Sequence, residues 1–259
     1  MPPRSKPNSK KNVVRDARAK NGTTRKSSGG SLWARHGETV KSITFVLVVW
    51  LFVRAFFVEA FRIPSGSMEP TLLVGDFLFV NKLIYGPHVP FTNIRLPAYG
   101  EPHRGDIVVY TSPFQIDLPE DPTPTVVKRI VGSAGDTLYM RQGTLYLNGI
   151  AQRQGYGVVP DPQVADEQHP DFDWQKKVGL ATSRFGASPK QPTHDNWGPF
   201  VVPVGHFFTL GDNRYNSKDG RYYGFVPRNN IWGRPLFMYL SLDFDAWSIR
   251  WSRIGHTVH

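Results

Sequence analysis

One continuous apolar run limits what this chain can fold into. The residues from Ser42 to Val58 read SITFVLVVWLFVRAFFV, in which 14 of 17 are apolar and only Arg54 is charged. Carried to Phe61 the run has 20 residues, and a helix of that length is about 30 Å long, which matches the apolar core of a bilayer. A cleaved signal sequence is less favoured, because no small-x-small site follows the run directly. A buried soluble helix is a further alternative. The run therefore predicts one transmembrane helix over residues 42–60.

The positive charge of the chain is concentrated ahead of this run. The net charge is +10, and residues 1–41 hold 11 Lys and Arg against Asp16 and Glu38, a local net charge of +9. This basic arm, rich in Ser, Gly and Asn, cannot bury enough apolar surface to fold alone, so it is expected to be disordered. Its charge places it in the cytoplasm and residues 61–259 on the outer face of the membrane. No nucleic-acid partner is expected, because membrane topology already accounts for the charge.

The pattern after the run is that of a β domain. Segments rich in β-branched and aromatic residues predict strands: 76–84, 106–110, 125–131, 136–147 and 206–210. The predicted fold is mainly β, an antiparallel sheet sandwich or barrel-like catalytic domain behind one N-terminal transmembrane helix. Within 136–147, Arg141-Gln142-Gly143 predicts a hairpin turn. Residues 150–204 are polar and rich in Pro, and predict a loop-rich insertion with weak strands. The apolar, Trp-rich segment 231–254 is expected to rejoin the core.

Metal, disulfide and histidine chemistry find little support in the sequence. The chain has no cysteine, which excludes disulfides and Cys-based metal or redox sites. Neither a Gly-x-Ser-x-Gly nor a His-Glu-x-x-His motif occurs. We expect no metal and no cofactor, and histidine is the less favoured general base. The eight histidines lie in the arm, in loop-like sequence, at a strand start or in the tail: His36, His88, His103, His169, His194, His206, His256 and His259.

The segment that follows the apolar run presents a serine at a bend. Residues 61–73 read FRIPSGSMEPTLL. Pro64 and Pro70 restrict the backbone on either side, and Gly66 permits angles that a side chain would forbid. A serine held at a bend beside apolar neighbours is suited to act as a nucleophile, which makes Ser67 the candidate. The alternative is an ordinary polar turn between a helix and a strand.

A serine nucleophile needs a base, and one lysine has an unusual position. Lys128 lies inside the run Val126-Val127-Lys128-Arg129-Ile130-Val131, where alternation puts Lys128 and Arg129 on opposite faces of a strand. One of these two charges must therefore point inward. If it is Lys128, burial lowers the pKa of its amine from about 10.4 towards about 7 or 8, and a neutral amine can act as a general base. The alternative is a lysine on a solvated face.

Four blocks in this order carry a family resemblance: 64–71 followed by Gly75-Asp76, then 104–109, 128–136 and 211–221. Together they resemble bacterial type I signal peptidase (leader peptidase). The resemblance runs from about Arg54 to Arg221, and the insertion at 150–204 lies outside it. The sequence departs from the usual pattern at Ser133-Ala134, Tyr215 and Gly220.

The resemblance implies a role for each matching residue. Ser67 would be the nucleophile and Lys128 the general base, the Ser67 amide and the Ser65 hydroxyl would form the oxyanion hole, and Ser217 would hold the lysine amine. Supporting residues are expected around this pair: Asp212, Asn213, Arg214, Asp219 and Arg221. Apolar residues are expected to line a shallow pocket for a small side chain such as Ala, with ordinary core packing as the alternative: Ile63, Pro64, Met68, Leu72, Val126 and Val127.

The sequence thus predicts a membrane-bound serine endopeptidase with a Ser-Lys dyad that removes signal peptides from exported preproteins at Ala-x-Ala sites. The expected location is the bacterial inner membrane, with the catalytic domain on the periplasmic or outer face. Signal peptides and membrane lipid are the expected partners, and the secretion translocon is a further candidate. Two alternatives remain open: a specialised pilin or conjugation processing peptidase, and a non-catalytic membrane-tethered β scaffold.

Overall fold

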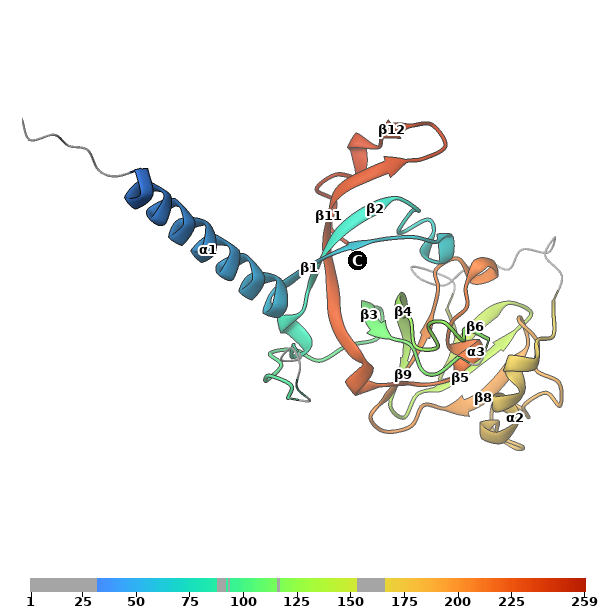
Figure 1. Cartoon of the computed structure of the whole chain (residues 1–259). Helices are drawn as coiled ribbons and strands as arrows, with labels where there is room; N and C mark the ends of the chain where they lie inside the picture. Colours follow the sequence, from blue (N-terminus) through green and yellow to red (C-terminus); the bar gives the residue numbers. More distant parts are fainter. Residues whose placement is uncertain (1–31, 88–91, 93, 116, 153–165) are drawn as a thin grey trace, which may run out of the picture. The chain divides into compact units, whose positions relative to one another are not determined.

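The computed structural model describes residues 32–87, 92, 94–115, 117–152 and 166–259. The chain divides into two units, residues 1–46 and 47–259. Helix α1 (Leu32–Phe56) begins in the first unit and ends in the second, and all described strands belong to the second (Figure 1).

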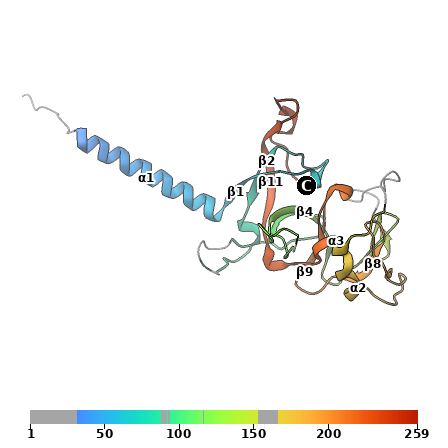
Figure 2. The same ribbon diagram turned by 45° about the vertical axis from the view of Figure 1, so that its right-hand side comes forward.

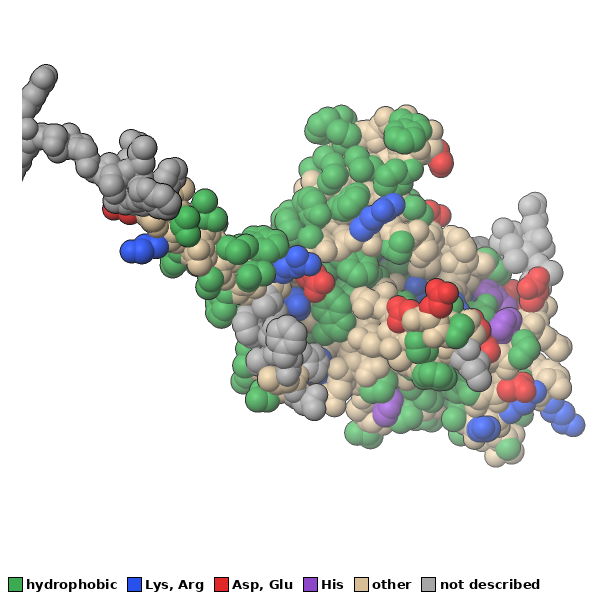
Figure 3. Space-filling view, viewed as in Figure 1, with side chains coloured by type: hydrophobic (Ala, Val, Ile, Leu, Met, Phe, Trp, Pro, Cys, Tyr) green, Lys and Arg blue, Asp and Glu red, His purple; other side chains and the backbone are tan. Residues whose placement is uncertain are grey.

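Helix α1 carries the apolar run. Its large apolar side chains between Ile43 and Val53 are 42–69% exposed, and Figure 3 shows them as a series of hydrophobic side chains along the helix. In the part of the chain that the structure describes, no helix is long and apolar enough to cross a membrane. The helix begins at Leu32, inside the arm for which the sequence predicts disorder. Residues 1–31 of that arm lie outside the described residues.

The prediction of a helix as far as residue 60 was wrong at its C-terminal end. Helix α1 ends at Phe56, and Val58–Arg62 form strand β1. Strand β1 pairs with β2 (Asp76–Asn81), with Ala60 opposite Phe79. Apolar content alone does not separate a helix from a strand in a short segment, and here the hydrogen bonds to a partner strand decide for the strand.

Residues 47–259 contain two antiparallel sheets (Figures 1 and 2). Among the described residues, the larger sheet has the strand order β1-β2-β11-β3-β4-β9-β10, with β12 paired to β11, and the smaller has the order β7-β6-β5-β8. The remaining bounds in the larger sheet are β3 Ile107–Thr111, β4 Thr125–Ser133, β9 His206–Leu210, β10 Val226–Pro227, β11 Ile231–Asp243 and β12 Ser248–Ile249. Those in the smaller are β5 Thr137–Arg141, β6 Thr144–Leu147, β7 Ile150–Ala151 and β8 Trp197–Val201. The mainly antiparallel β fold is therefore confirmed.

The long strand β11 joins the two halves of the larger sheet. Its residues Arg234–Ser241 pair with β2, whereas Ile231 and Gly233 pair with β3. The register shifts along both pairings, and such irregularities bend a strand. Through β11, the β1–β2 hairpin is attached to the half of the sheet that contains β4.

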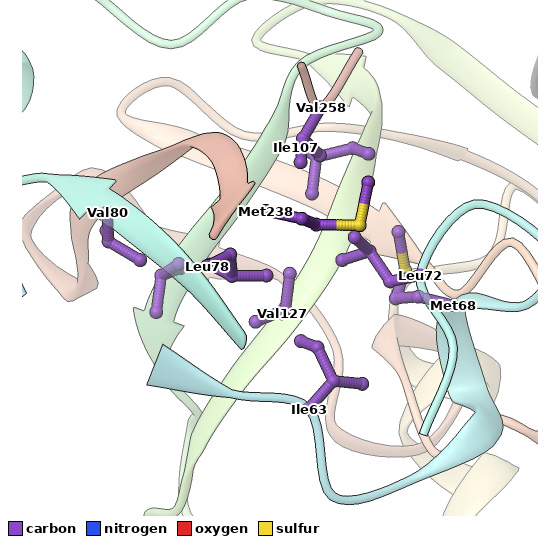
Figure 4. Close-up of a cluster of buried hydrophobic side chains, with 10 residues drawn as sticks. Ile63, Met68, Leu72, Leu78, Val80, Ile107, Val127, Met238 and Val258 are labelled. Atoms are coloured by element: carbon purple, nitrogen blue, oxygen red, sulfur yellow. The ribbon is translucent and has the colours of Figure 1, made fainter. Parts of the chain in front are cut away.

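A buried apolar cluster lies between these two halves. Figure 4 shows side chains from the turn after β1 meeting others from β2, β4 and β11. The members are Ile63, Met68, Leu72, Leu78, Val80, Ile107, Val127, Met238 and Val258, together with Val109. Burying side chains of this size contributes about 1.5–3 kcal/mol each. This packing fixes the turn at residues 63–72 against β4.

The hairpin and the insertion agree with their predictions to different degrees. Gln142 and Gly143 have φ values of 48° and 71°, as the predicted tight turn between β5 and β6 requires. The insertion, described outside residues 153–165, contains helix α2 (Trp174–Val178) and strand β8. Strand β8 buries Trp197 and Phe200 in a second apolar cluster. The described part of the insertion is therefore rich in loops with short strands, as predicted, and it also packs into the domain.

Candidate active site

The turn that carries Ser67 is a short 3₁₀ helix, Gly66–Met68. Two hydrogen bonds close the loop around it, from the Ile63 amide to the Asp76 carbonyl (2.8 Å) and from the Gly75 amide to the Ile63 carbonyl (3.0 Å). Gly66 does not use the left-handed backbone angles that a glycine permits. A Cβ there would lie 3.0 Å from the carboxyl group of Glu69, the end of a flexible side chain.

Lys128 points from β4 directly at this turn. Its Nζ donates to the Ser67 Oγ at 2.7 Å and to the Val127 carbonyl at 3.2 Å. The residue is only 4% exposed. Burial lowers the pKa of the Lys128 amine to about 8, with Asp219 and Asp212 opposing and Arg221 reinforcing this shift. Within the described residues, no carboxylate forms an ion pair with the amine, so its hydrogen bonds to neutral groups are its local support.

The neighbouring cation, Arg129, is also buried, at 8% exposure. Alternation on β4 puts the two charges on opposite faces of the strand, and because both side chains are buried, both faces are covered at this point. Arg129 donates from Nε and Nη2 to the two carboxylate oxygens of Asp212, at 2.8 and 2.7 Å. The Asp212 carboxylate also accepts from the Thr71 hydroxyl at 2.6 Å. This pair ties β4 to the loop after β9 and to the Ser67 turn.

The loop after β9, residues 211–219, packs on the same turn. The Asn213 amide donates to the Ser67 carbonyl at 3.1 Å. Gly211 lies so close that a Cβ there would be 2.5 Å from that carbonyl and 2.2 Å from the Ser217 Oγ. Any other residue at 211 would push the loop away from the serine, because a backbone oxygen cannot move aside cheaply.

The predicted support residues Ser65 and Ser217 lie beside the pair without bonding to Lys128. Ser217 is 7% exposed and lines one cavity with Ser67 and Lys128, but its Oγ has no hydrogen-bond partner among the described residues. The predicted contact with the lysine amine is therefore not formed in this structure. Ser65 is exposed and lines the cavities on both sides of Ser67.

The predicted support residues Asp219 and Arg221 form a fully buried ion pair. Arg221 Nη2 lies 2.9 Å from Asp219 Oδ2, and both side chains are 0% exposed. Burial by itself raises the pKa of Asp219, but the charge and hydrogen bonds of Arg221, with the Gly211 amide, lower it overall. The predicted residue Arg214 is also buried and donates from Nε to the Gly211 carbonyl at 3.0 Å.

Two cavities adjoin the Ser67–Lys128 pair. The smaller, about 100 Å³, is lined by Phe61, Ile63, Pro64, Ser65, Ser67, Met68 and residues 125–128. It includes five of the six residues predicted to contact substrate. The sixth, Leu72, does not line this cavity; it is 0% exposed and belongs to the apolar cluster, in agreement with the core-packing alternative. The larger cavity, about 550 Å³, extends from Ser67 and Lys128 towards Gln115, Asp117 and Lys218.

In the described part of the chain, no group of three or more His, Asp or Glu residues is placed to hold a metal ion. One histidine nevertheless reaches the loop beside Lys128. His194, from the insertion, is buried and lies 2.8 Å from the carbonyl oxygen of Arg214. Sequence reasoning placed it among loop histidines, and no local motif distinguishes it from the others.

Comparisons with known proteins agree with the family resemblance. The model of the family described as "Signal peptidase, peptidase S26" matches residues 36–240. The chain is 36% identical over 225 residues to a Pseudomonas aeruginosa protein named Signal peptidase I, covering 79% of this chain and 72% of that protein. It is 29% identical over 236 residues to the Signal peptidase I of Aquifex aeolicus, covering 79% and 84%. A solved signal peptidase I from Enterococcus faecalis is similar at 28% identity over 52% of this chain and 96% of that chain, with a TM-score of 0.32, too low to support an argument.

Proposed function

The chain belongs to the peptidase S26 family of signal peptidases, and from that premise we propose that it cleaves signal peptides with Ser67 as nucleophile and Lys128 as general base. The observation that carries this proposal is the 2.7 Å hydrogen bond from Lys128 Nζ to Ser67 Oγ in a buried site. A nucleophile and its base must lie within this distance for a proton to pass between them.

The lowered pKa of Lys128 supports the role of base. With a pKa of about 8, roughly a tenth of the amine is neutral at pH 7, against roughly one part in a few thousand for an exposed lysine. The neutral amine takes the proton of Ser67 Oγ as Oγ bonds to the scissile carbonyl carbon. The protonated amine then returns this proton to the leaving nitrogen as the C–N bond breaks. Water, activated by the same amine, releases the acyl group from Ser67.

Stabilisation of the oxyanion is proposed for the Ser67 amide and the Ser65 hydroxyl. The Ser67 amide lies in the first turn of a 3₁₀ helix, where N–H groups have no partner inside the helix. Ser65 precedes this turn and lines the same cavities as Ser67. Removing one such donor costs about 3 kcal/mol of transition-state stabilisation.

The small cavity supports specificity for small residues near the cut. It holds about 100 Å³ next to Ser67 and is bounded by apolar side chains such as Ile63 and Met68. A side chain of the size of Ala fits a space of this kind, whereas a large aromatic ring needs the walls to move. We therefore propose Ala-x-Ala sites in exported preproteins as substrates.

Membrane attachment is proposed for the apolar stretch of α1. Its large side chains from Ile43 to Val53 are 42–69% exposed, and lipid contact would remove them from water. The predictions of a span, of a cytoplasmic N-terminus and of a translocon partner stay predictions. Alkaline extraction of membranes tests attachment, and protease protection of an N-terminal tag tests the topology. Release of the full chain by alkali would contradict a span.

Cleavage of an Ala-x-Ala preprotein in detergent or lipid tests the proposed function. Ser67→Ala is expected to abolish cleavage, and Ser252→Ala, which changes an exposed serine, to leave it unchanged. Cleavage by Ser67→Ala at the wild-type rate would remove the proposed nucleophile. Processing of a pilin-type precursor in place of the preprotein would favour the dedicated peptidase.

A further inference from the structure

The insertion places a buried His–Asp pair against the loop that follows β9. His194 and Asp195 immediately precede β8 and are 9% and 8% exposed. The His194 Nδ1 lies 2.7 Å from Asp195 Oδ1. The ring stacks on Tyr215 with centroids 5.0 Å apart, and the Tyr215 hydroxyl donates to Asp195 Oδ2 at 3.3 Å. Two elements far apart in the sequence are therefore joined by one polar cluster.

The partners of His194 determine which nitrogen carries the proton. Nη1 of Arg221 hydrogen-bonds to His194 Nε2. A guanidinium has only donors, so in this contact Nε2 accepts, and Nδ1 is the ring nitrogen left to donate to Asp195. The Arg214 carbonyl, which lies 2.8 Å from Nε2, instead receives Nη2 of Arg221 at 2.6 Å. His194 is thus an acceptor for one arm of the Arg221 fork.

Arg221 transmits this contact to the loop. Its side chain donates to both carboxylate oxygens of Asp219, each at 2.9 Å, and from Nη2 to the Ser217 carbonyl at 3.4 Å. Asp219 in turn accepts from the Gly211 amide at 3.0 Å. The guanidinium therefore contacts the loop at Arg214, Ser217 and Asp219. His194 accepts from its remaining nitrogen, Nη1.

The loop in turn bears on the proposed catalytic pair. The Asn213 amide donates to the Ser67 carbonyl, and Ser217 lines the cavity that contains Ser67 and Lys128. The Lys128 amine is affected by charge as well. Burial is the main cause of its lowered pKa, Asp219 raises that pKa, and Arg221 lowers it. A displacement of Arg221 would change both the position of the loop and the field at the amine.

We propose that His194, oriented by Asp195, is a positioning residue for the Ser67–Lys128 pair, acting through Arg221 and the loop at residues 211–219. The inference rests on the proposed function of that pair, and it assigns a role to the insertion: supplying a hydrogen-bond acceptor that orients Arg221. His194 touches neither Ser67 nor Lys128 and is not a catalytic residue.

Kinetics of three substitutions at residue 194 test the inference with the full chain and an Ala-x-Ala preprotein. The amide oxygen of His194→Gln reaches the place of Nε2, whereas the side chains of His194→Asn and His194→Ala do not. We expect kcat to fall about 10- to 100-fold in Asn and Ala, a size typical of displaced catalytic groups, and to be largely restored in Gln. KM should change little, because the small cavity at Ile63 and Met68 contains no residue of this cluster.

The pH profile provides a readout that a merely structural role would not move. In His194→Ala the guanidinium loses an acceptor, whereas Asp219 stays held by two backbone amides, those of Gly211 and Arg221. Arg221 is then free to move away from Lys128 while Asp219 stays, so the pKa of the Lys128 amine should rise. The acidic limb of kcat/KM is therefore expected to move to higher pH. His206→Gln is the matched control, since this histidine lies at the other end of β9 and bonds the Val204 carbonyl.

Three outcomes would overturn the inference: wild-type kcat and pH profile in His194→Ala, equal loss in Gln and Asn, or the same loss in His206→Gln. If His194→Ala does not fold, the comparison of Gln with Asn decides alone. Failure of the proposed function is distinct, because the wild-type chain would then not cleave the preprotein at all.

Discussion

Lys128 and Arg129 are adjacent on β4 and almost equally buried, yet only Arg129 has a carboxylate partner. Arg129 forms a two-pronged ion pair with Asp212. Lys128 hydrogen-bonds a hydroxyl and a carbonyl, and burial lowers the pKa of its amine to about 8. Burial by itself therefore does not decide whether a cation is structural or reactive. The presence of a carboxylate partner does.

The difference follows from the cost of removing a charge from water. An unpaired buried cation is destabilised, and an amine relieves this cost by losing its proton. A guanidinium cannot do so, because its pKa lies far above physiological pH, and it needs a carboxylate instead. The chain places the residue that can deprotonate on the Ser67 side and the residue that cannot on the Asp212 side.

The largest expected effect is on activity, in Lys128→Met. Methionine keeps the length and apolar contacts of the lysine stem but has no group to accept a proton. We expect cleavage of a preprotein to fall by about 10²–10⁴-fold, the range that general base catalysis contributes. Steady-state kinetics measure the loss, and Lys190→Met, at an exposed lysine, is the control. Retention of more than about a tenth of the activity would mean that another group takes the serine proton.

The next effect is on stability, in Arg129→Met. In this variant the buried Asp212 carboxylate keeps only one side-chain donor, the Thr71 hydroxyl. Breaking a buried ion pair in this way costs about 3–5 kcal/mol of unfolding free energy. Urea denaturation measures it. Arg129→Met combined with Asp212→Leu should recover part of the loss, because the unpaired charge is then gone. If the unfolding free energy of Arg129→Met lay within about 1 kcal/mol of that of the wild type, the ion pair with Asp212 would not explain the difference between Arg129 and Lys128.

The smallest effect is a pH dependence of stability that belongs to Lys128. Its folded-state pKa, about 8, lies below its value of 10.5 outside the protein. Between these values the unfolded chain binds more protons than the folded chain, so stability rises with pH, by about 1.4 kcal/mol per pH unit and on the order of 3 kcal/mol in full. The difference in unfolding free energy between wild type and Lys128→Met, measured from pH 7 to pH 9.5, isolates this contribution. A difference independent of pH would contradict a lowered pKa.

Much of the β domain could be predicted from local pattern. Strand β9 has the predicted bounds, and the hairpin at Gln142-Gly143 lies where the turn residues indicated it. These features depend on alternation and on turn geometry, which are local properties. The end of α1 could not be predicted in the same way, because the five residues Val58–Arg62 are too short a segment for periodicity to separate helix from strand, and they form a strand through their pairing with β2.

The site shows the same division. Ser67 and Lys128 could be chosen from their motifs, and the structure brings them within 2.7 Å. For Leu72 the sequence left substrate contact and core packing open, and the structure buries it outside the lining of the small cavity. His194 gave no signal, since its partner Arg221 is 27 positions away and belongs to another element.

The amino-acid sequence by itself determined where along the chain most strands lie, the serine turn after the apolar run, and the presence of two adjacent cations within an apolar strand. Only the tertiary structure decided that both cations are buried, which of them receives a carboxylate, and that the insertion contacts the loop beside Lys128. The reason is physical: alternation and turn chemistry act between near neighbours, whereas the desolvation and pairing of a charge depend on what the whole fold packs around it.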